Sequence, residues 1–373
     1  MMPHILHAFG SNNHNQLGIP PSDPSGDKVK NPTHSGYPPQ DEAISSLSGG
    51  AQHTVFLTSE GNVYGAGNNV QGQMNVFQKL YSGIDFVAAG WTSTAYIVNP
   101  PVNDDHERHA KIYTEGTCRW GELGRGVQND STSITNTGPN NTPLKTTLPG
   151  HAISFAAGTH HYVAVTDDGS VYGWGKTRHG QLGDEPHPLL IPTKLPGTWP
   201  AQKVVCGHEF TYVVGAPDKG DQRIMGRDAF GIHNLPADIR GWKDICATWH
   251  AVFILFSDGR LLAWGKNDFW QLIPPNLPLI DQIVTGPEHV LALTRDGQLI
   301  SWGWGGDGNC GDLSVIVPPP VNDRVTGCFN TITGIPGRIV AIGAGPNTSF
   351  VLSRLLGGEA EATELLAQPD MPS

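Results

Sequence analysis

The sequence contains few charged residues and no long apolar run. Charged residues make up 15% of its 373 positions, and the formal net charge is −11. An acidic chain with no Lys/Arg-rich arm at either end gains little from the release of phosphate counterions, so we expect no direct nucleic-acid binding. No apolar stretch approaches the roughly 20 residues of a membrane span, and the N-terminal MMPHILHAFG lacks the pattern of a secretory signal. These absences predict a soluble, unsecreted protein of the cytoplasm that makes no membrane contact, and they leave a nuclear fraction open.

Motifs for catalysis, metal binding and cofactor binding are also missing. The five cysteines contain no Cys-x-x-Cys pair, so we expect free, buried thiols in a reducing compartment. The chain has no Gly-x-Ser-x-Gly and no His-Glu-x-x-His, and acid pairs such as Asp167-Asp168 fall in turns, where solvated carboxylates are common. Residues 303–308 match Gly-x-Gly-x-x-Gly, but no helical pattern follows to receive a pyrophosphate. We therefore expect no cofactor and no enzymatic activity.

What the chain does contain is glycine in a repeated context. Seven glycines each close a short apolar run and open a loop that often reads Gly-Gln-Leu-Gly: Gly10, Gly67, Gly116, Gly175, Gly226, Gly265 and Gly303. They lie 38 to 59 residues apart, which is long enough for a small sheet but too short for a unit that buries its own apolar face. The units must therefore pack on one another.

Each unit reads as a β-hairpin. Residues 53–67 (HTVFLTSEGNVYGAG), 161–175 (HYVAVTDDGSVYGWG) and 289–303 (HVLALTRDGQLISWG) are two apolar runs joined by an acidic residue and glycine. Such a turn is a strong hairpin signal, because glycine adopts positive φ at little cost. From His250 to Gly265 the frame HAVFILFSDGRLLAWG is one residue longer, which predicts a β-bulge or a longer turn.

The hairpins predict a closed ring. Aligning the units on Gly-x-x-His gives seven equivalent hairpin entries: His53, Ser93, His161, Phe210, His250, His289 and Thr348. The last entry has no second strand after it, and the strand that ends at Gly10 has no partner before it, so the end of the chain must pair with its start. We predict an all-β, seven-bladed propeller over residues 1–356 that is closed by the N-terminal strand, and a mobile acidic tail over residues 357–373.

Histidine recurs at four of these entries, which raises the question of a metal site. Equivalent positions in neighbouring blades are separated by about 10 Å, whereas zinc ligands lie roughly 2 Å from one ion. We therefore expect no metal site. Each of these imidazoles is instead expected to hydrogen-bond the backbone of its own loop and to order the entry to its blade.

Aromatic and charged residues outside the repeat pattern are the candidates for partner contact. Trp174, Trp264 and Trp302 recur at the Trp-Gly ends and are expected to pack between blades. Trp91 and Trp249 stand in entry loops, and Trp304 begins the loop GWGGDGNCG; exposed tryptophan is enriched at the centres of interfaces. Charged and polar neighbours on the same predicted face would suit a partner of complementary charge. The full candidate set is Trp91, His208, Glu209, Trp249, His250, Glu288, His289, Trp304 and Asp307.

The repeated frame Gly-x-x-His…Asp-Gly-x-(Val/Leu)-x-x-Trp-Gly…Gly-Gln-Leu-Gly resembles the repeat of the regulator of chromosome condensation family, over about residues 5–353. Within that family, residues 88–98 (AAGWTSTAYIV), 285–294 (TGPEHVLALT) and 301–311 (SWGWGGDGNCG) resemble the fungal alpha-tubulin suppressor type, also described as the killer-toxin-insensitivity type. The third segment also resembles the vertebrate secretion-regulating exchange-factor type. The family resemblance implies a seven-bladed propeller, in agreement with the repeat count.

The resemblance to the alpha-tubulin suppressor type implies a non-catalytic adaptor that forms a heterodimer. Its expected partner is a small CSL-type metal-ribbon protein of diphthamide biosynthesis, and through it the adaptor would support Elongator-dependent modification of tRNA wobble uridines. The alternative is guanine-nucleotide exchange on a small Ran-like GTPase, the activity of the founding member of the wider family. In that case a loop at residues 99–111 or 128–150 would wedge against the nucleotide site. A plain scaffold is a third reading.

Overall fold

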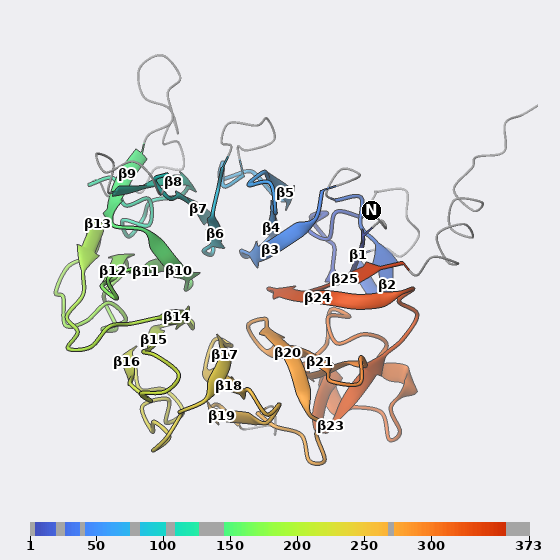
Figure 1. Cartoon of the computed structure of the whole chain (residues 1–373). Helices are drawn as coiled ribbons and strands as arrows, with labels where there is room; N and C mark the ends of the chain where they lie inside the picture. Colours follow the sequence, from blue (N-terminus) through green and yellow to red (C-terminus); the bar gives the residue numbers. More distant parts are fainter. Residues whose placement is uncertain are drawn as a thin grey trace, which may run out of the picture.

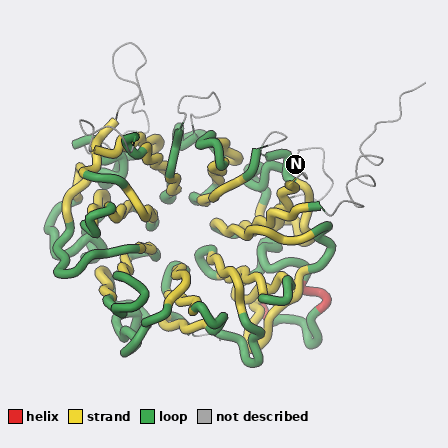
Figure 2. The backbone as a smooth tube through the Cα atoms, in the orientation of Figure 1, coloured by secondary structure: helices red, strands yellow, loops and turns green. Residues whose placement is uncertain are grey.

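The computed structural model describes residues 4–19, 27–37, 42–74, 83–101, 109–126, 145–267 and 272–355. These residues form seven antiparallel sheets, or blades, arranged around a central axis (Figure 1). Almost everything else is loop and turn (Figure 2). No helix in the described part of the chain has the length and apolar character to cross a bilayer. The predicted tail of residues 357–373 and its boundary lie outside the described residues.

The blades follow one another along the chain, and neighbouring strands within a blade are hydrogen-bonded in the order in which they are named. Blade 1 is β3 (Ile44–Gly49), β4 (His53–Thr58) and β5 (Val63–Gly67); blade 2 is β6 (Phe86–Ala89), β7 (Ser93–Val98), β8 (His109–Gly116) and β9 (Lys145–Pro149). Blade 3 is β10 (Ala152–Ala157), β11 (His161–Thr166), β12 (Val171–Gly175) and β13 (Leu189–Lys194); blade 4 is β14 (Lys203–Cys206), β15 (Phe210–Val214) and β16 (Gln222–Gly226). Blade 5 is β17 (Trp242–Ala247), β18 (Ala251–Phe256) and β19 (Leu261–Gly265); blade 6 is β20 (Ile280–Thr285), β21 (His289–Thr294), β22 (Leu299–Trp304) and β23 (Arg324–Ile332). Blade 7 is β24 (Arg338–Gly345), β25 (Thr348–Arg354), β1 (His4–Ser11) and β2 (Lys28–His34), and two short 3-10 helices, η2 (Leu313–Val315) and η3 (Val321–Asp323), precede β23.

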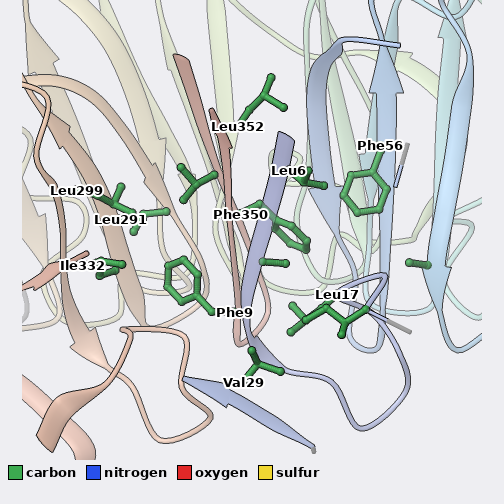
Figure 3. Close-up of a cluster of buried hydrophobic side chains, with 14 residues drawn as sticks. Leu6, Phe9, Leu17, Val29, Phe56, Leu291, Leu299, Ile332, Phe350 and Leu352 are labelled. Carbon is green, nitrogen blue, oxygen red and sulfur yellow. The ribbon is translucent and has the colours of Figure 1, made fainter. Parts of the chain in front are cut away.

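The ring is closed by the N-terminal strand, as the sequence predicts. Strand β1 lies between β25 and β2 and pairs with β25 from His4 opposite Arg354 to Gly10 opposite Thr348. Its apolar side chains enter a core shared with blades 1 and 6, in which Phe9 and Phe350 are fully buried (Figure 3). The rings of Phe350 and Phe56 meet edge to face at 5.5 Å, which joins blade 7 to blade 1.

Tryptophans at the Trp-Gly ends pack between blades, as predicted. The indole Nε1 of Trp174 in blade 3 donates to the carbonyl oxygen of Glu122, in the loop after β8 of blade 2, at 2.9 Å. Trp302 donates in the same way to the carbonyl of Leu272 at 3.1 Å. Each bond satisfies a buried donor with the loop that follows the repeated glycine of the preceding blade, so the Trp-Gly and Gly-Gln-Leu-Gly elements of the repeat act together.

The seven repeated glycines have one backbone role. All seven have φ between 98° and 121°, and a Cβ at Gly67 would overlap the carbonyl oxygen of Gln52. The residue after each glycine donates its N–H to the carbonyl of the residue that precedes the second strand: for example, Asn68 donates to Gln52 at 2.8 Å and Lys176 donates to His160 at 2.8 Å. This contact recurs in all seven blades, because only glycine allows so close an approach.

The predicted start of the hairpin in blade 5 is wrong by one residue. Ala251, and not His250, pairs with Gly265, in the way that His53 pairs with Gly67 and His161 with Gly175. The hairpin turn therefore has the usual length, with no added residue. Thr248 takes the place of the entry glycine and donates its N–H to the carbonyl of Ala251 at 2.9 Å. His250 is thus not equivalent to the entry histidines His53, His161 and His289.

A simple steric rule explains why Thr248 and Ala251 occur together. At Gly207 the three atoms nearest to an added Cβ all belong to the ring of Phe210, which lies over the glycine. In blade 5 the residue at the ring position is alanine, so the β-branched threonine fits. At Gly50, Gly158, Gly207 and Gly286 the entry glycine is therefore required by the ring three residues later and not by its own dihedral angles.

We expect Gly207→Thr to lower the free energy of unfolding by about 2–4 kcal/mol, through overpacking against Phe210. In a Phe210→Ala background the same threonine should cost less than about 1 kcal/mol, because alanine is the natural solution of blade 5. Urea denaturation of the four proteins measures the coupling. Equal costs in both backgrounds would contradict the steric rule.

The three remaining entry histidines connect neighbouring blades. Their Nε2 atoms lie at 2.9–3.0 Å from a hydroxyl of the next blade: His53 faces Thr94, His161 faces Thr211 and His289 faces Ser349. Each hydroxyl in turn donates at 2.7–2.8 Å to a carbonyl in the loop that follows the repeated glycine of the histidine's own blade. The expected bond to the histidine's own loop backbone is therefore wrong. Because the hydroxyl proton is already used, each histidine must carry its proton on Nε2.

These histidines should make stability fall as the solution is acidified. Burial lowers the pKa of His53 and His289 from 6.5 to about 4 and that of His161 to about 3. On acidification the unfolded chain therefore binds protons before the folded chain does. The contribution of these neutral histidines to the free energy of unfolding is complete above pH 6.5 and is lost as the pH falls towards 4. For His53 and His289, a pKa fall from 6.5 to about 4 corresponds to about 3 kcal/mol each.

We expect the free energy of unfolding, measured with urea, to decrease steeply between pH 7 and pH 5. His161→Phe copies blade 4, where Phe210 occupies this position, and should lose about 1 kcal/mol at pH 7.5. The variant should also show a shallower pH dependence than the parent. An unchanged slope would show that His161 does not titrate in the unfolding transition.

Candidate protein-binding face

One face of the ring carries the loops that join the first and second strands of the blades, together with the loops that follow the repeated glycines. We call it the entry face; the opposite face carries the hairpin turns and is called the turn face. On the entry face Trp91 of blade 2 and Trp249 of blade 5 meet, with ring centroids 5.7 Å apart. His208 contacts Trp249 edge to face at 5.3 Å. Trp91 is 37% exposed, so the pair offers aromatic surface at the centre of the ring.

The backbone holds these tryptophans in place. Trp91 and Trp249 occupy the same repeat position, one residue after the entry glycine or its threonine replacement. The N–H of Trp91 donates to the carbonyl of Thr159 at 2.9 Å, and the N–H of Trp249 donates to the carbonyl of Pro287 at 3.0 Å. Each bond runs to the next blade. Beneath them is a cavity of about 180 Å³ whose lining includes small residues such as Gly90 and Gly207.

A cluster of bases surrounds Glu209 beside the tryptophans. Its Oε1 lies 2.8 Å from His179 Nε2 and 3.8 Å from both Lys176 Nζ and His208 Nδ1. Its Oε2 lies 3.4 Å from Arg227 Nη1. Burial lowers the pKa of His208 and of His179, so both imidazoles are neutral at pH 7, and Lys176 and Arg227 supply the positive charge.

The cluster continues into blades 5 and 6. His250 contacts the ring of Phe230 at 5.2 Å, and Lys266 Nζ lies 5.4 Å from the centre of the same ring. Lys266 also pairs with Glu288 at 3.3 Å. Trp304 lines a small pocket together with His250, Lys266 and Glu288. Further out, at the contact between blades 6 and 7, Asp307 pairs with Lys28 at 3.3 Å.

At the inner repeat positions of the entry face, charge is concentrated in one part of the ring. Two repeat positions meet there in every blade, namely the residue before the second strand and the residue after the repeated glycine. In blades 7, 1 and 2 they are uncharged: Asn347 and Ser11, Gln52 and Asn68, Thr92 and Thr117. In blades 3 to 6 they are His160 and Lys176, Glu209 and Arg227, His250 and Lys266, Glu288 and Trp304. At these inner positions a partner would therefore find charged groups only on blades 3 to 6.

Exposed apolar side chains also gather on this face. Ten large apolar residues of the described chain are exposed, and seven of them stand in entry-face loops: Val70, Trp91, Phe230, Ile273, Val315, Val317 and Val321. The entry face therefore carries most of the large exposed apolar side chains among the described residues.

Most predicted site residues lie together here. Trp91, His208, Glu209, Trp249, His250, Glu288, Trp304 and Asp307 all stand on the entry face. His289 is the exception: it is 1% exposed and bonded to Ser349, so it cannot offer surface to a partner, and its assignment to the site was wrong. Sequence reasoning missed Lys176, His179, Arg227, Phe230 and Lys266. Aligning the residue after each repeated glycine would have found three of them.

Among the described residues, no group of three or more His, Cys, Asp or Glu side chains is placed to hold a metal ion. The two loops considered for nucleotide exchange leave opposite faces. Residues 99–108 join β7 to β8 on the turn face, whereas the segment before β9 leaves from the entry face. Residues 102–108 and 127–144 lie outside the described part of the chain, so the wedge itself is not described.

Comparison with known proteins agrees with the propeller fold described above. The regulator of chromosome condensation (RCC1) repeat matches residues 4–73, 152–214 and 280–309. An RCC1 repeat-containing protein of Schizosaccharomyces pombe is 26% identical over 93% of this chain and 98% of its own length. The secretion-regulating guanine nucleotide exchange factor of Mus musculus is 23% identical over 94% of this chain and 84% of its own. The solved structure of Prp20p from Saccharomyces cerevisiae has a TM-score of 0.75 at 20% identity, covering 99% of this chain and 96% of that one.

Proposed function

We propose that this chain, which belongs to the RCC1-like repeat propeller family, is a non-catalytic adaptor that binds a protein partner through its entry face. The observation that carries the proposal is the Trp91–Trp249 pair at the centre of that face. Beside it, the two repeat positions that meet in every blade carry charged side chains only in blades 3 to 6. A buried aromatic centre with a polar rim is the arrangement of a protein interface. Regulation by binding is also the common role of the family.

For the partner we propose a small CSL-type metal-ribbon protein of diphthamide biosynthesis, bound as a heterodimer. The support is the position of the three segments that resemble the alpha-tubulin suppressor type. Residues 88–98 contain Trp91, residues 285–294 contain Glu288, and residues 301–311 contain Trp304 and Asp307. All three segments thus contribute to one face, although the first comes from blade 2 and the other two from blade 6. A shared partner is a physical reason for such a grouping.

The adaptor would act by covering part of its partner's surface. A partner seated on the tryptophan pair would have part of its own surface covered, and this would decide which larger assembly it can join, including Elongator. Lys176 and Arg227 suit acidic groups of the partner, and Glu288 and Asp307 suit basic ones. We expect the complex in the cytoplasm, where diphthamide formation and tRNA modification would use it.

Guanine-nucleotide exchange is the second candidate. It is favoured by the similarity to the mouse secretion-regulating guanine nucleotide exchange factor and to Prp20p, whose structure is described together with its binding to Gsp1p and histones. An exchange factor binds its GTPase most tightly when nucleotide is absent. An exchange factor should therefore capture its partner only when nucleotide is absent, whereas an adaptor should capture its partner with or without nucleotide.

Affinity purification of the tagged full chain from its own cells tests the proposal. After a moderate salt wash we expect one small Cys-rich protein in stoichiometric amount, and we expect its loss when the bait carries both Trp91→Ala and Trp249→Ala. A small GTPase that is enriched only after nucleotide has been stripped would replace the adaptor by an exchange factor. Recovery of no stoichiometric partner would contradict both.

A further inference from the structure

A groove on the turn face separates blade 3 from blade 4. It has a volume of about 470 Å³ and lies beside the connection from β13 to β14. Its apolar lining comes from Val171, Leu195, Trp199 and Val213, and the side chain of Arg223 from β16 completes it. This site is distinct from the entry face, so it does not depend on the function proposed above.

Arg223 is exceptional within the repeat. It stands three residues before the repeated glycine Gly226, at a position where the other six blades have His7, Tyr64, Tyr113, Tyr172, Leu262 and Ile300. None of these six carries a permanent charge. The pKa of His7 is lowered to about 4 by burial, so it too is neutral at pH 7. The interface between blades therefore does not require an arginine at this position.

The guanidinium of Arg223 has no acceptor among the described residues. No described residue accepts a hydrogen bond from it or forms an ion pair with it, and its Nε is buried without a partner. The acid that lines the groove, Asp168, is already engaged by Thr166 Oγ1 at 2.6 Å and by Ser170 N at 2.9 Å. Partial burial lowers the pKa of Arg223, because desolvation disfavours its charged form. A cation removed from water without a partner weakens a fold, so an external anion is the natural complement.

We propose that this groove binds a carboxylate side chain of an acidic peptide segment, with Arg223 as its ligand and the apolar side chain next to the carboxylate packed against Trp199. The arginine fork can donate two parallel bonds to a carboxylate, and Lys194 at the rim adds positive charge. The rim residues Pro196, Thr198 and Pro200 are exposed and leave the groove open. An open groove suits a side chain presented by an extended peptide, whereas small ligands are usually enclosed.

The test is an array of immobilised peptides probed with the full-length protein. Each peptide carries a central Asp or Glu flanked by Leu, Ile, Val, Phe, Tyr or Trp, and each has an Asn or Gln twin. A subset of the acidic peptides should be retained at least tenfold more strongly than their twins. Arg223→Leu, which places the blade 5 residue at this position, should abolish that difference. No preference for acid over amide, or retention unaffected by Arg223→Leu, would overturn the proposal.

Arg240→Leu is the matched control. Arg240 lies in the connection from blade 4 to blade 5, next to Gly220 of the β15–β16 turn, but it is exposed and already paired with Asp238 at 2.7 Å. This variant should retain the acidic peptides within twofold of the parent. The thermal midpoint of Arg223→Leu without peptide should be unchanged or higher, because an unpaired charge has been removed. A lower midpoint would show that Arg223 has a partner within the fold and would also overturn the proposal.

Discussion

Deleting residues 1–10 is expected to abolish cooperative folding. The deletion removes most of β1, which pairs with β25 on one side and with β2 on the other. It also removes Leu6 and Phe9 from the core, and losses of this kind cost about 2–5 kcal/mol and 3–5 kcal/mol even for substitution by alanine. Their sum approaches the total stability of a typical domain, about 5–15 kcal/mol. The two sheet edges left open would favour aggregation.

Soluble yield and the thermal transition in circular dichroism measure this effect. A circular permutant provides the control, because His4 lies opposite Arg354 and a short linker can join residue 355 to residue 4 as a hairpin. A chain running from residue 27 to 355 and then from residue 4 to 19 keeps every β1 contact and should melt cooperatively. Normal solubility and melting of the deletion variant would show that β1 is not needed for ring closure.

Trp249→Ala is expected to weaken binding of the captured partner by about 100-fold, and Trp91→Ala by about tenfold. Truncation of an aromatic residue at the centre of an interface commonly costs 2 kcal/mol or more. Because the two rings touch at 5.7 Å, the double variant should lose less than the product of the two effects. Isothermal titration of the purified proteins gives the three affinities.

Ile153→Ala is a suitable control for this series. Ile153 is 43% exposed at the start of β10, towards the turn face, so the substitution removes exposed apolar surface away from the entry face. The affinity of the Ile153→Ala variant for the captured partner should stay within twofold of that of the parent. If both tryptophan variants also keep full affinity, the partner does not use the centre of the entry face.

The sequence predicts the fold well because the information for it is local and repeated. Glycine at the close of each hairpin and the unpaired first and last strands together fix seven blades and their closure. The error in blade 5 has a local cause as well: histidine at 250 matches the repeat pattern, but register is set by the cross-strand pair of Ala251 with Gly265. Pattern matching cannot detect that a threonine has replaced the entry glycine.

The candidate site was predicted only in part, because its contacts join different blades. Trp91 and Trp249 could be selected as exposed aromatics, but their contact across the ring joins residues 158 positions apart in the chain. The hydroxyl partners of His53, His161 and His289 also lie in the next blade. The bases around Glu209 come from three different loops. Such pairings depend on how the blades pack, and a single sequence does not display that.

Hydrogen exchange on the isolated complex tests the central claim most directly. If the partner sits on the entry face, binding should slow exchange of the amides in residues 88–94, 206–211 and 247–252 by at least tenfold. Exchange in the turn-face hairpins, such as residues 166–171 and 256–261, should not change. Protection of the turn-face hairpins, with unchanged exchange around Trp91 and Trp249, would contradict the account.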